Sequence, residues 1–294
     1  MSHTNPIMNA MNICKLFEDA EAAVRWMMAK KLLKSSQLCG KCGRELHFRT
    51  TGINNAEGCK WVCTTHACKS WSCSVRRGSM FAGSKASLKQ AVLLLYYWGN
   101  NTTVKETAEE VNLTRQMVAK YFKEIRLVLI NSIEQTGPMI GGIGTTVEID
   151  ETKITKRKHN KEWLVGGICQ ETKDVFLKQV ERRDAETLTS VIQDNVLIGT
   201  RLVTDCWCGY NRLAQVGFAH DTVNSLNFLS PNNALIQTQN EENLWRWLKE
   251  YLKQKGTNRL RNLNEYLAEY VFRRMHPNAF ESIIEAIGRE TEDS

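Results

Sequence analysis

The sequence predicts a mixed α/β protein in which a sheet with helices on both faces follows a cysteine-rich segment and a group of helices. Three observations predict this architecture. From residue 145 onward, segments with strand character alternate with segments of helical periodicity. Two of the expected strands end in carboxylates. Closely spaced cysteines and amphipathic helical patterns occupy the first 136 residues instead.

Length and charge narrow the class of protein. The chain has 294 residues, 42% of them hydrophobic, which is enough for two or three small domains with buried cores. No apolar run approaches the roughly 20 residues of a membrane span, and the N-terminus lacks a signal-peptide pattern. We therefore expect an intracellular protein with no membrane partner. The net charge of +7, with a basic run at 153–161, suits a polyanionic partner, and a solvated basic surface is the alternative.

The first 80 residues combine a helix with a metal-binding pattern. Apolar residues recur at helical spacing over 13–33, which predicts a packing helix. Closely spaced cysteines in an intracellular protein bind metal more often than they form disulfides. Two pairs, separated by short strands at 46–50 and 60–62, supply four thiolates for tetrahedral Zn²⁺ in a zinc ribbon: Cys39, Cys42, Cys63 and Cys68. Three residues are possible substitutes in the second pair: Cys59, His66 and Cys73. Four thiolates leave no open position, so the metal would be structural.

Three helices are expected next. An apolar helix covers 84–98, Thr103 and Glu106 form a capping box for the second helix, and Thr114 caps the third. The buried stripe of the third helix is Val118, Phe122, Ile125 and Leu129. Its outer side carries the candidate DNA contacts Arg115, Gln116, Lys120 and Lys123. Basic and amide side chains at the start of a second short helix are typical of a helix-turn-helix, although any three-helix packing unit can mimic it.

After a Gly-rich linker at 137–144, the elements follow an order typical of one fold. Strands are expected at 145–152, 163–169 and 175–180, then a helix from Asp184, a strand at 201–204, a helix near 211, a strand at 222–223 and a helix at 240–253. This order is that of a ribonuclease H-like fold, a mixed sheet with helices on both faces. In that fold, carboxylates on the first strand, the fourth strand and a late helix converge.

Those three places hold Asp150, Asp205 and Glu242. Three close carboxylates repel one another unless divalent cations lie between them, and oxygen ligands suit Mg²⁺ or Mn²⁺. Two such ions can activate water or a 3′-hydroxyl and stabilise the leaving oxygen in a phosphoryl transfer. Glu241 is the alternative to Glu242 if the helix register differs by one residue. Lys249 lies on the same helix face as Glu242 and is expected either to contact phosphate or to be solvated.

Other residues near these positions receive no chemical role. Trp207 and Trp245 are expected in the core, and Cys206 and Cys208 have no partners for a metal site. Alternation along the first strand places Glu148 on the face of Asp150 and Glu151 on the opposite face.

An ordered set of segments resembles the transposases of Merlin-type DNA transposons and their bacterial insertion-sequence relatives, whose catalytic unit is the ISXO2-like transposase domain. The matching segments are Val-Glu-Ile-Asp150-Glu-Thr, Trp163-Leu-Val-Gly-Gly-Ile168, Arg183-Asp-Ala-Glu-Thr-Leu188, Val203-Thr-Asp205-x-Trp-x-Gly-Tyr210 and Gln237-Thr-Gln-Asn-Glu-Glu242-x-x-Trp245. The cysteine pairs and Ser74-Val-Arg-Arg-Gly-Ser79 resemble the ribbon of the family. The likeness covers nearly the whole chain and keeps the order of its parts.

The resemblance implies a DDE-type cut-and-paste DNA transposase that cleaves terminal inverted repeats and joins the 3′-hydroxyl to target DNA. It implies Mg²⁺ or Mn²⁺ at the three carboxylates, structural Zn²⁺ at the four cysteines, double-stranded DNA as partner, and a homodimer or larger synaptic complex. It also implies nuclear localisation if the source is eukaryotic, and cytoplasmic otherwise. The implied domains are 1–80 with the ribbon, 81–136 with the helix-turn-helix, the linker 137–144, the catalytic domain 145–276 and a tail at 277–294.

Three departures from the family pattern define an alternative. Gln237 stands where a histidine is typical, a histidine is missing after Asn224, and the loop before Trp163 is short. A domesticated or decayed copy that binds DNA without catalysis is therefore the rival function. A ribonuclease H-like nuclease without transposition is a weaker alternative, because it would not need two further DNA-binding units.

Overall fold

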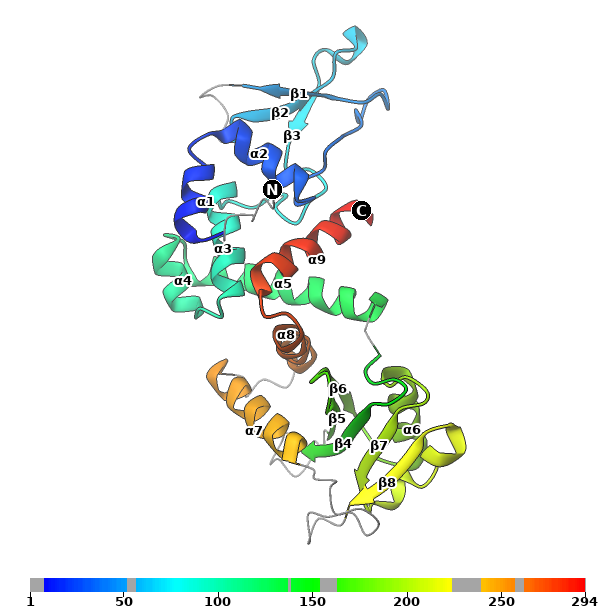
Figure 1. The fold of residues 1–294 in the computed structure, drawn as a ribbon. Helices are drawn as coiled ribbons and strands as arrows, with labels where there is room; N and C mark the ends of the chain where they lie inside the picture. Colours follow the sequence, from blue (N-terminus) through cyan, green and yellow to red (C-terminus); the bar gives the residue numbers. More distant parts are fainter. Residues whose placement is uncertain are drawn as a thin grey trace, which may run out of the picture. The chain divides into compact units, whose positions relative to one another are not determined.

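A computed structural model of the chain describes residues 8–51, 57–136, 139–153, 163–223, 239–256 and 262–293. The chain folds into two compact units. Unit 1 contains Met1–Val128 and Asn278–Ser294, and unit 2 contains Leu129–Pro277 (Figure 1). Within the described ranges, no helix is both long and apolar enough to cross a membrane.

Unit 1 begins with two helices where the sequence predicts one. Helices α1 (Ala10–Leu16) and α2 (Ala20–Ala29) replace the single expected helix at 13–33. The break occurs because Asp19 has extended backbone angles and its carboxylate accepts the backbone N–H groups of Glu21 and Ala22. A side chain that satisfies the free N–H groups of a helix start favours a new helix over continuation of the previous one.

A small antiparallel sheet carries the cysteine-rich segment. Its strands are β1 (His47–Thr50), β2 (Cys59–Val62) and β3 (Ser72–Ser74), in the order β1-β2-β3. A single 3₁₀ turn, η2 (His66–Cys68), lies between β2 and β3. Strands β1 and β2 lie at the two short strands expected at 46–50 and 60–62, whereas β3 was not predicted.

Helices α3 (Leu88–Gly99), α4 (Val104–Glu110) and α5 (Arg115–Thr136) follow in the predicted order. The capping box of Thr103 and Glu106 is present, and the Thr114 hydroxyl accepts the backbone N–H of Met117 at 3.3 Å. The expected stripe on α5, from Val118 to Leu129, is buried. Helical periodicity and the caps therefore predicted these three elements.

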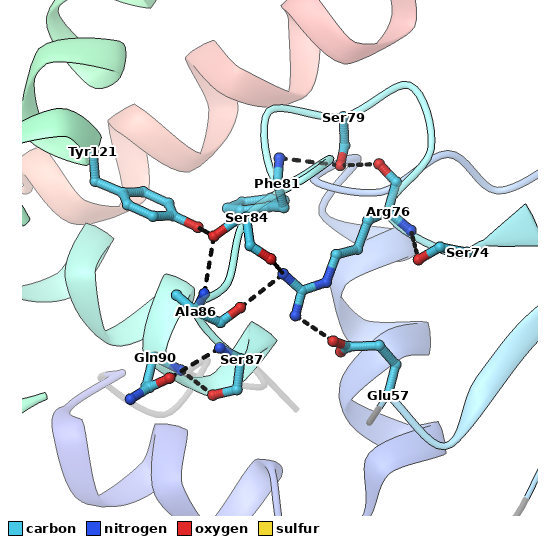
Figure 2. A network of polar contacts seen from close by, with 10 residues as sticks. All are labelled: Glu57, Ser74, Arg76, Ser79, Phe81, Ser84, Ala86, Ser87, Gln90 and Tyr121. Carbon is cyan, nitrogen blue, oxygen red and sulfur yellow. Dashed lines mark hydrogen bonds and ion pairs between the residues drawn. The ribbon is translucent and has the colours of Figure 1, made fainter. Parts of the chain in front are cut away.

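One buried arginine joins the sheet to the helices of unit 1 (Figure 2). The Arg76 guanidinium donates to the carbonyl oxygens of Ala86 at 2.7 Å and Ser84 at 3.2 Å, and it forms an ion pair with Glu57. The Tyr121 hydroxyl of α5 donates to the Ser84 hydroxyl. The network links residues from the two stretches expected as domains, 1–80 and 81–136, within unit 1.

The C-terminal stretch, expected as a tail at 277–294, is mostly helix α9 (Ala279–Asp293), which belongs to unit 1. Phe280, Ile283 and Ile287 are buried in it. A Cβ at Gly99 of α3 would lie 2.8 Å from the Phe280 Cβ, so the glycine permits the close approach of the two helices. Apolar residues at helical spacing explain why this stretch folds rather than trailing in solvent.

Unit 2 contains a five-stranded mixed sheet in the order β6-β5-β4-β7-β8. The strands are β4 (Thr146–Lys153), β5 (Trp163–Cys169), β6 (Val175–Val180), β7 (Arg201–Asp205) and β8 (Ala219–Val223). The first three pair antiparallel, whereas β4, β7 and β8 are parallel.

Helices cover both faces of this sheet. One hydrophobic core joins the sheet to α6 (Ala185–Asn195), through Leu188, Ile192 and Val147 among others. The other joins it to α7 (Gln239–Gln254) and α8 (Leu263–Met275), through Leu244 and Leu164 among others. Mixed pairing in this order, with helices on both faces, confirms the predicted ribonuclease H-like fold.

Two local expectations in unit 2 differ from the structure. The helix expected near residue 211 is a pair of 3₁₀ turns, η3 (Cys208–Tyr210) and η4 (Leu213–Val216), and Gly217 at φ +97° ends the second. The linker expected at 137–144 is partly built into the core, because Ile140 is buried and pairs with Val196. Glycines therefore mark the turns of this segment, while Ile140 packs in the core.

Candidate active site

Strand register brings Asp150 and Asp205 together. In the parallel pair β4 and β7, Glu148 lies opposite Val203, so two further residues along each strand place Asp150 level with Asp205. Neighbouring strands are about 4.8 Å apart. Alternation puts both carboxylates on the face of the sheet covered by α7. The sequence predicted these two residues as partners, and the fold brings them side by side on the neighbouring strands β4 and β7.

Glu151 is a third carboxylate at this edge, and the sequence reasoning gave it no role. Oxygen atoms of Asp150, Glu151 and Asp205 all lie within 4.8 Å of one another. Glu151 leaves the strand toward the α6 face, as alternation predicts, but β4 extends only two residues beyond it, to Lys153. The pair of adjacent acidic residues near a strand end was the signal that could have identified it.

The packing of these groups affects their protonation. Burial raises the pKa of Asp150, and the nearby Asp205 raises it further, whereas Trp245 and Lys249 oppose the shift. Burial, with the charges of Asp150 and Asp205, raises the pKa of Glu151 to about 7. These shifts mean that negative charge is costly here, and a bound cation would relieve that cost.

Two hydrogen bonds fix the orientation of the aspartates. The Trp245 indole N–H donates to the Asp150 carboxylate at 3.0 Å, from a buried position on α7 as expected. The backbone N–H of Trp207 donates to the Asp205 carboxylate at 3.0 Å. Trp207 is 37% exposed, so its expected core position is not observed. Glu148 lies on the same face as Asp150, and its carboxylate accepts a hydrogen bond from the Gln170 amide at 2.6 Å.

The third predicted ligand lies outside the described side chains. Glu241 and Glu242 belong to the backbone of α7, but their side chains are not among those that the structure describes. Gln237, the missing histidine after Asn224 and the short loop before Trp163 fall outside the described residues too, as does the basic run beyond Lys153. Lys249 is exposed on α7, and its charge lowers the pKa of Asp150.

Gly166 of β5 makes the Trp245 contact possible. It pairs with Asp150 across the sheet, and a Cβ there would lie 2.6 Å from the Trp245 ring and 2.9 Å from Leu177. We therefore expect Gly166→Ala to displace the indole, destabilise unit 2 by about 1–3 kcal/mol and lower activity. Urea unfolding and the Trp245–Asp150 distance in a crystal structure would measure this.

The control for that variant is Gly144→Ala, where an added Cβ meets no atom within 4 Å, although its φ of +81° adds backbone strain. A Gly166→Ala protein that loses activity no more than the control would show that the Trp245 contact does not position Asp150.

The four predicted cysteines form a second cluster, in unit 1. Their sulfur atoms lie within 4.8 Å of one another, with 3.9 Å between Cys39 and Cys68 and 3.7 Å between Cys42 and Cys63. Tetrahedral zinc with Zn–S bonds of about 2.3 Å requires S···S separations of roughly 3.8 Å. The arrangement therefore fits a zinc ion without movement of the backbone.

The surroundings of the cysteine cluster lower the pKa of one thiol and raise that of another. The backbone N–H of Arg44 lowers the pKa of Cys42 to about 6. A hydrogen bond with Cys42 and burial raise the pKa of Cys68 to about 12. The alternative residues do not join the cluster among the described residues: Cys59 is fully buried at the start of β2, and Cys73 lies next to Arg77.

The side chains predicted to contact DNA from α5 lie at the surface. They are Arg115, Gln116, Lys120 and Lys123. Lys120 forms an exposed i,i+4 ion pair with Glu124 at 3.6 Å, an interaction worth little in water. The side of α5 opposite the buried stripe is therefore accessible to a partner.

Comparison with known proteins agrees with the geometry of unit 2. Residues 132–274 match the family model described as the ISXO2-like transposase domain. That stretch, which holds the carboxylate cluster, is therefore similar to a transposase domain. No curated protein matches the chain.

Two solved structures are similar to the chain at low identity. The HTLV-2 integrase catalytic core domain in complex with magnesium is 15% identical, over 45% of this chain and 85% of that chain, with a TM-score of 0.30. The simian T-cell lymphotropic virus intasome in complex with PP2A regulatory subunit B56 gamma is 12% identical, over 61% of this chain and 65% of that chain, with a TM-score of 0.34.

Proposed function

We propose that the protein is a DDE-type DNA transposase that cleaves the ends of its own element and joins the 3′-hydroxyl to target DNA. The observation that carries the proposal is the convergence of Asp150, Glu151 and Asp205 at one strand edge, within the stretch that matches a transposase domain. In its more specific form, the proposal is a Merlin-type transposase. It would act in the nucleus if the source is a eukaryote, and as a synaptic dimer or larger assembly.

The residues of the cluster fit hard divalent cations. Carboxylate oxygens are the ligands that Mg²⁺ and Mn²⁺ prefer. When bound, such ions would supply Lewis-acid stabilisation of an in-line phosphoryl displacement. The chain itself orients Asp150 through the Trp245 N–H and Asp205 through the Trp207 N–H.

Glu242 is our proposal for a further ligand. It stands three residues before Trp245 on α7, and Lys249 stands four residues after it. Residues three and four apart share one face of a helix. Trp245 on this helix bonds to Asp150, which supports Glu242 as the residue of α7 that joins the cluster. We propose that Lys249 contacts a phosphate of the bound strand.

For unit 1 we propose zinc-stabilised DNA binding. Zn²⁺ bound by the four cysteines would hold the ribbon, and α5 would present its exposed cations to the major groove as the recognition helix of a helix-turn-helix. The network around Arg76 supports a common role, because it fixes the ribbon to the start of α3 (Figure 2).

The direct test is metal-dependent cleavage and joining of DNA that carries the inverted repeats bordering the coding sequence. We expect nicked and joined products with Mg²⁺ or Mn²⁺, and none with a chelator. Tight, sequence-specific binding without products in either metal would contradict the enzymatic function. It would support the alternative, a domesticated or decayed DNA-binding protein.

Charge reversal on α5 tests the role of unit 1. Lys120→Glu is expected to weaken binding to a DNA duplex and to reduce the slope of log K against log salt by about 1, because one phosphate contact is lost. Fluorescence anisotropy over a salt series measures both quantities. Lys89→Glu, at an exposed position of α3, is the control. Equal effects of the two variants would make α5 a packing helix only.

A further inference from the structure

An arginine next to the carboxylate cluster is held by two tryptophans, one in β5 and the other in the segment after β7. The guanidinium carbon of Arg183 lies 4.3 Å from the ring centroid of Trp163 and 4.3 Å from that of Trp207. The ammonium of Lys153 lies 4.6 Å from the Trp163 ring. Two positive side chains and two indoles therefore form one group, which we call the Arg183 stack. It joins the ends of β4 and β5 to the segment after β7.

The Arg183 stack adjoins the carboxylates. Trp207 contacts Arg183 with its ring and Asp205 with its backbone N–H. The charge of Arg183 also lowers the pKa of Glu151, against the larger effect of burial. Gly209 contributes by having no side chain, because a Cβ there would lie 2.6 Å from the Trp207 ring nitrogen. Trp207 and Gly209, in the segment that follows Asp205, thus both help to form the Arg183 stack.

The stack orients Arg183 without occupying its hydrogen-bond donors. Among the described residues, the guanidinium makes ring contacts but no hydrogen bond or ion pair. Its neighbour Arg182 differs, because it is 80% exposed and forms an ion pair with Asp184 at 3.4 Å. Stacking covers the flat surface of a guanidinium and leaves the N–H groups at its edge free to donate.

We propose that Arg183, oriented by Trp163 and Trp207, binds a backbone phosphate of the DNA strand that enters the carboxylate cluster. This proposal rests on the proposed function and adds a binding residue to it. The carboxylates repel the phosphates of the strand, so a fixed cation at the edge of the cluster offsets that repulsion. Arginine suits the task because its planar fork donates two parallel hydrogen bonds to a phosphate. Stacking also removes much of the side-chain entropy that binding would otherwise cost.

The test compares Arg183→Ala with Arg182→Ala, which removes the same charge from the adjacent residue outside the stack. Binding of a labelled DNA duplex to the full chain is measured by anisotropy across a salt series in Ca²⁺, a hard cation that suits carboxylate ligands. We expect Arg183→Ala to weaken binding about tenfold and to reduce the salt slope by about 1, and Arg182→Ala to change the slope by much less. Arg183→Lys keeps the charge but loses the fork, and its affinity is expected between those of Arg183→Ala and wild type.

The outcomes separate this inference from the proposed function. If wild type cleaves DNA and both alanine variants give the same affinity and slope, Arg183 does not bind phosphate and the inference fails alone. If wild type binds but does not cleave, the proposed catalysis fails, and the contrast between the alanine variants still decides the role of Arg183. Equal melting temperatures of the two alanine variants would exclude misfolding. If Arg183→Ala unfolds, the test uses Arg183→Lys, and an affinity equal to that of wild type would overturn the proposal.

Discussion

Asp205→Asn is expected to lower the rate of metal-dependent DNA cleavage by at least about a thousandfold, because a carboxylate ligand is worth several kcal/mol to the transition state and each 1.36 kcal/mol is tenfold. Asparagine keeps the shape of the side chain and can still accept the Trp207 N–H, so local structure should persist. The variant also removes one of three mutually repelling charges, and its melting temperature should not fall. Single-turnover kinetics in Mn²⁺ would measure the rate.

The control for Asp205→Asn is Asp194→Asn, which makes the same chemical change at an exposed position of α6. It should leave the cleavage rate within about twofold of wild type, as surface substitutions away from special features usually do little. Equal rates for Asp205→Asn and wild type would remove Asp205 from the catalytic site, whatever the activity of the chain.

Loss of the metal from unit 1 is expected to have the largest effect on stability. Structural zinc contributes about 10–16 kcal/mol of apparent binding free energy in small zinc-dependent domains. The sheet of β1, β2 and β3 has a small core, so a chelator or Cys42→Ser should unfold it. Hydrogen exchange should then rise over 37–75 while unit 2 keeps its protection, because unit 2 has its own two hydrophobic cores.

Metal analysis of the purified chain should give one zinc per wild-type protein and less in Cys42→Ser. The matched control is Cys73→Ser, since Cys73 lies in the same sheet but outside the cluster. Full protection over 37–75 in metal-free protein would show that the four cysteines are only closely packed thiols.

The alternation and length of buried strands made the fold of unit 2 predictable. Val147 and Ile149 face one core, so Asp150 had to face the other side, and the end of β7 placed Asp205 beside it. The cysteine pairs were predictable for a similar reason, since their spacing around short strands leaves few ways to bring four sulfurs together.

Residues of the site whose roles depend on distant partners were not predictable from local pattern. Glu151 joins Asp150 and the distant Asp205, although alternation alone assigned it to the face opposite Asp150. Trp207 was expected in the core, but it is partly exposed and its ring contacts Arg183. The close contact of α9 with α3 involves Gly99, which is 280 − 99 = 181 residues before Phe280 in the chain.

The most direct test of the carboxylate cluster as a divalent-metal site is cleavage of the polypeptide itself by Fe²⁺ in place of Mg²⁺. With ascorbate and peroxide, bound Fe²⁺ generates radicals that break nearby backbone. We predict breaks next to Asp150 and Asp205 that excess Mg²⁺ suppresses and that are lost in Asp205→Asn. Breaks confined to other regions of the chain, or breaks at these residues that persist in Asp205→Asn, would contradict a metal site at this strand edge.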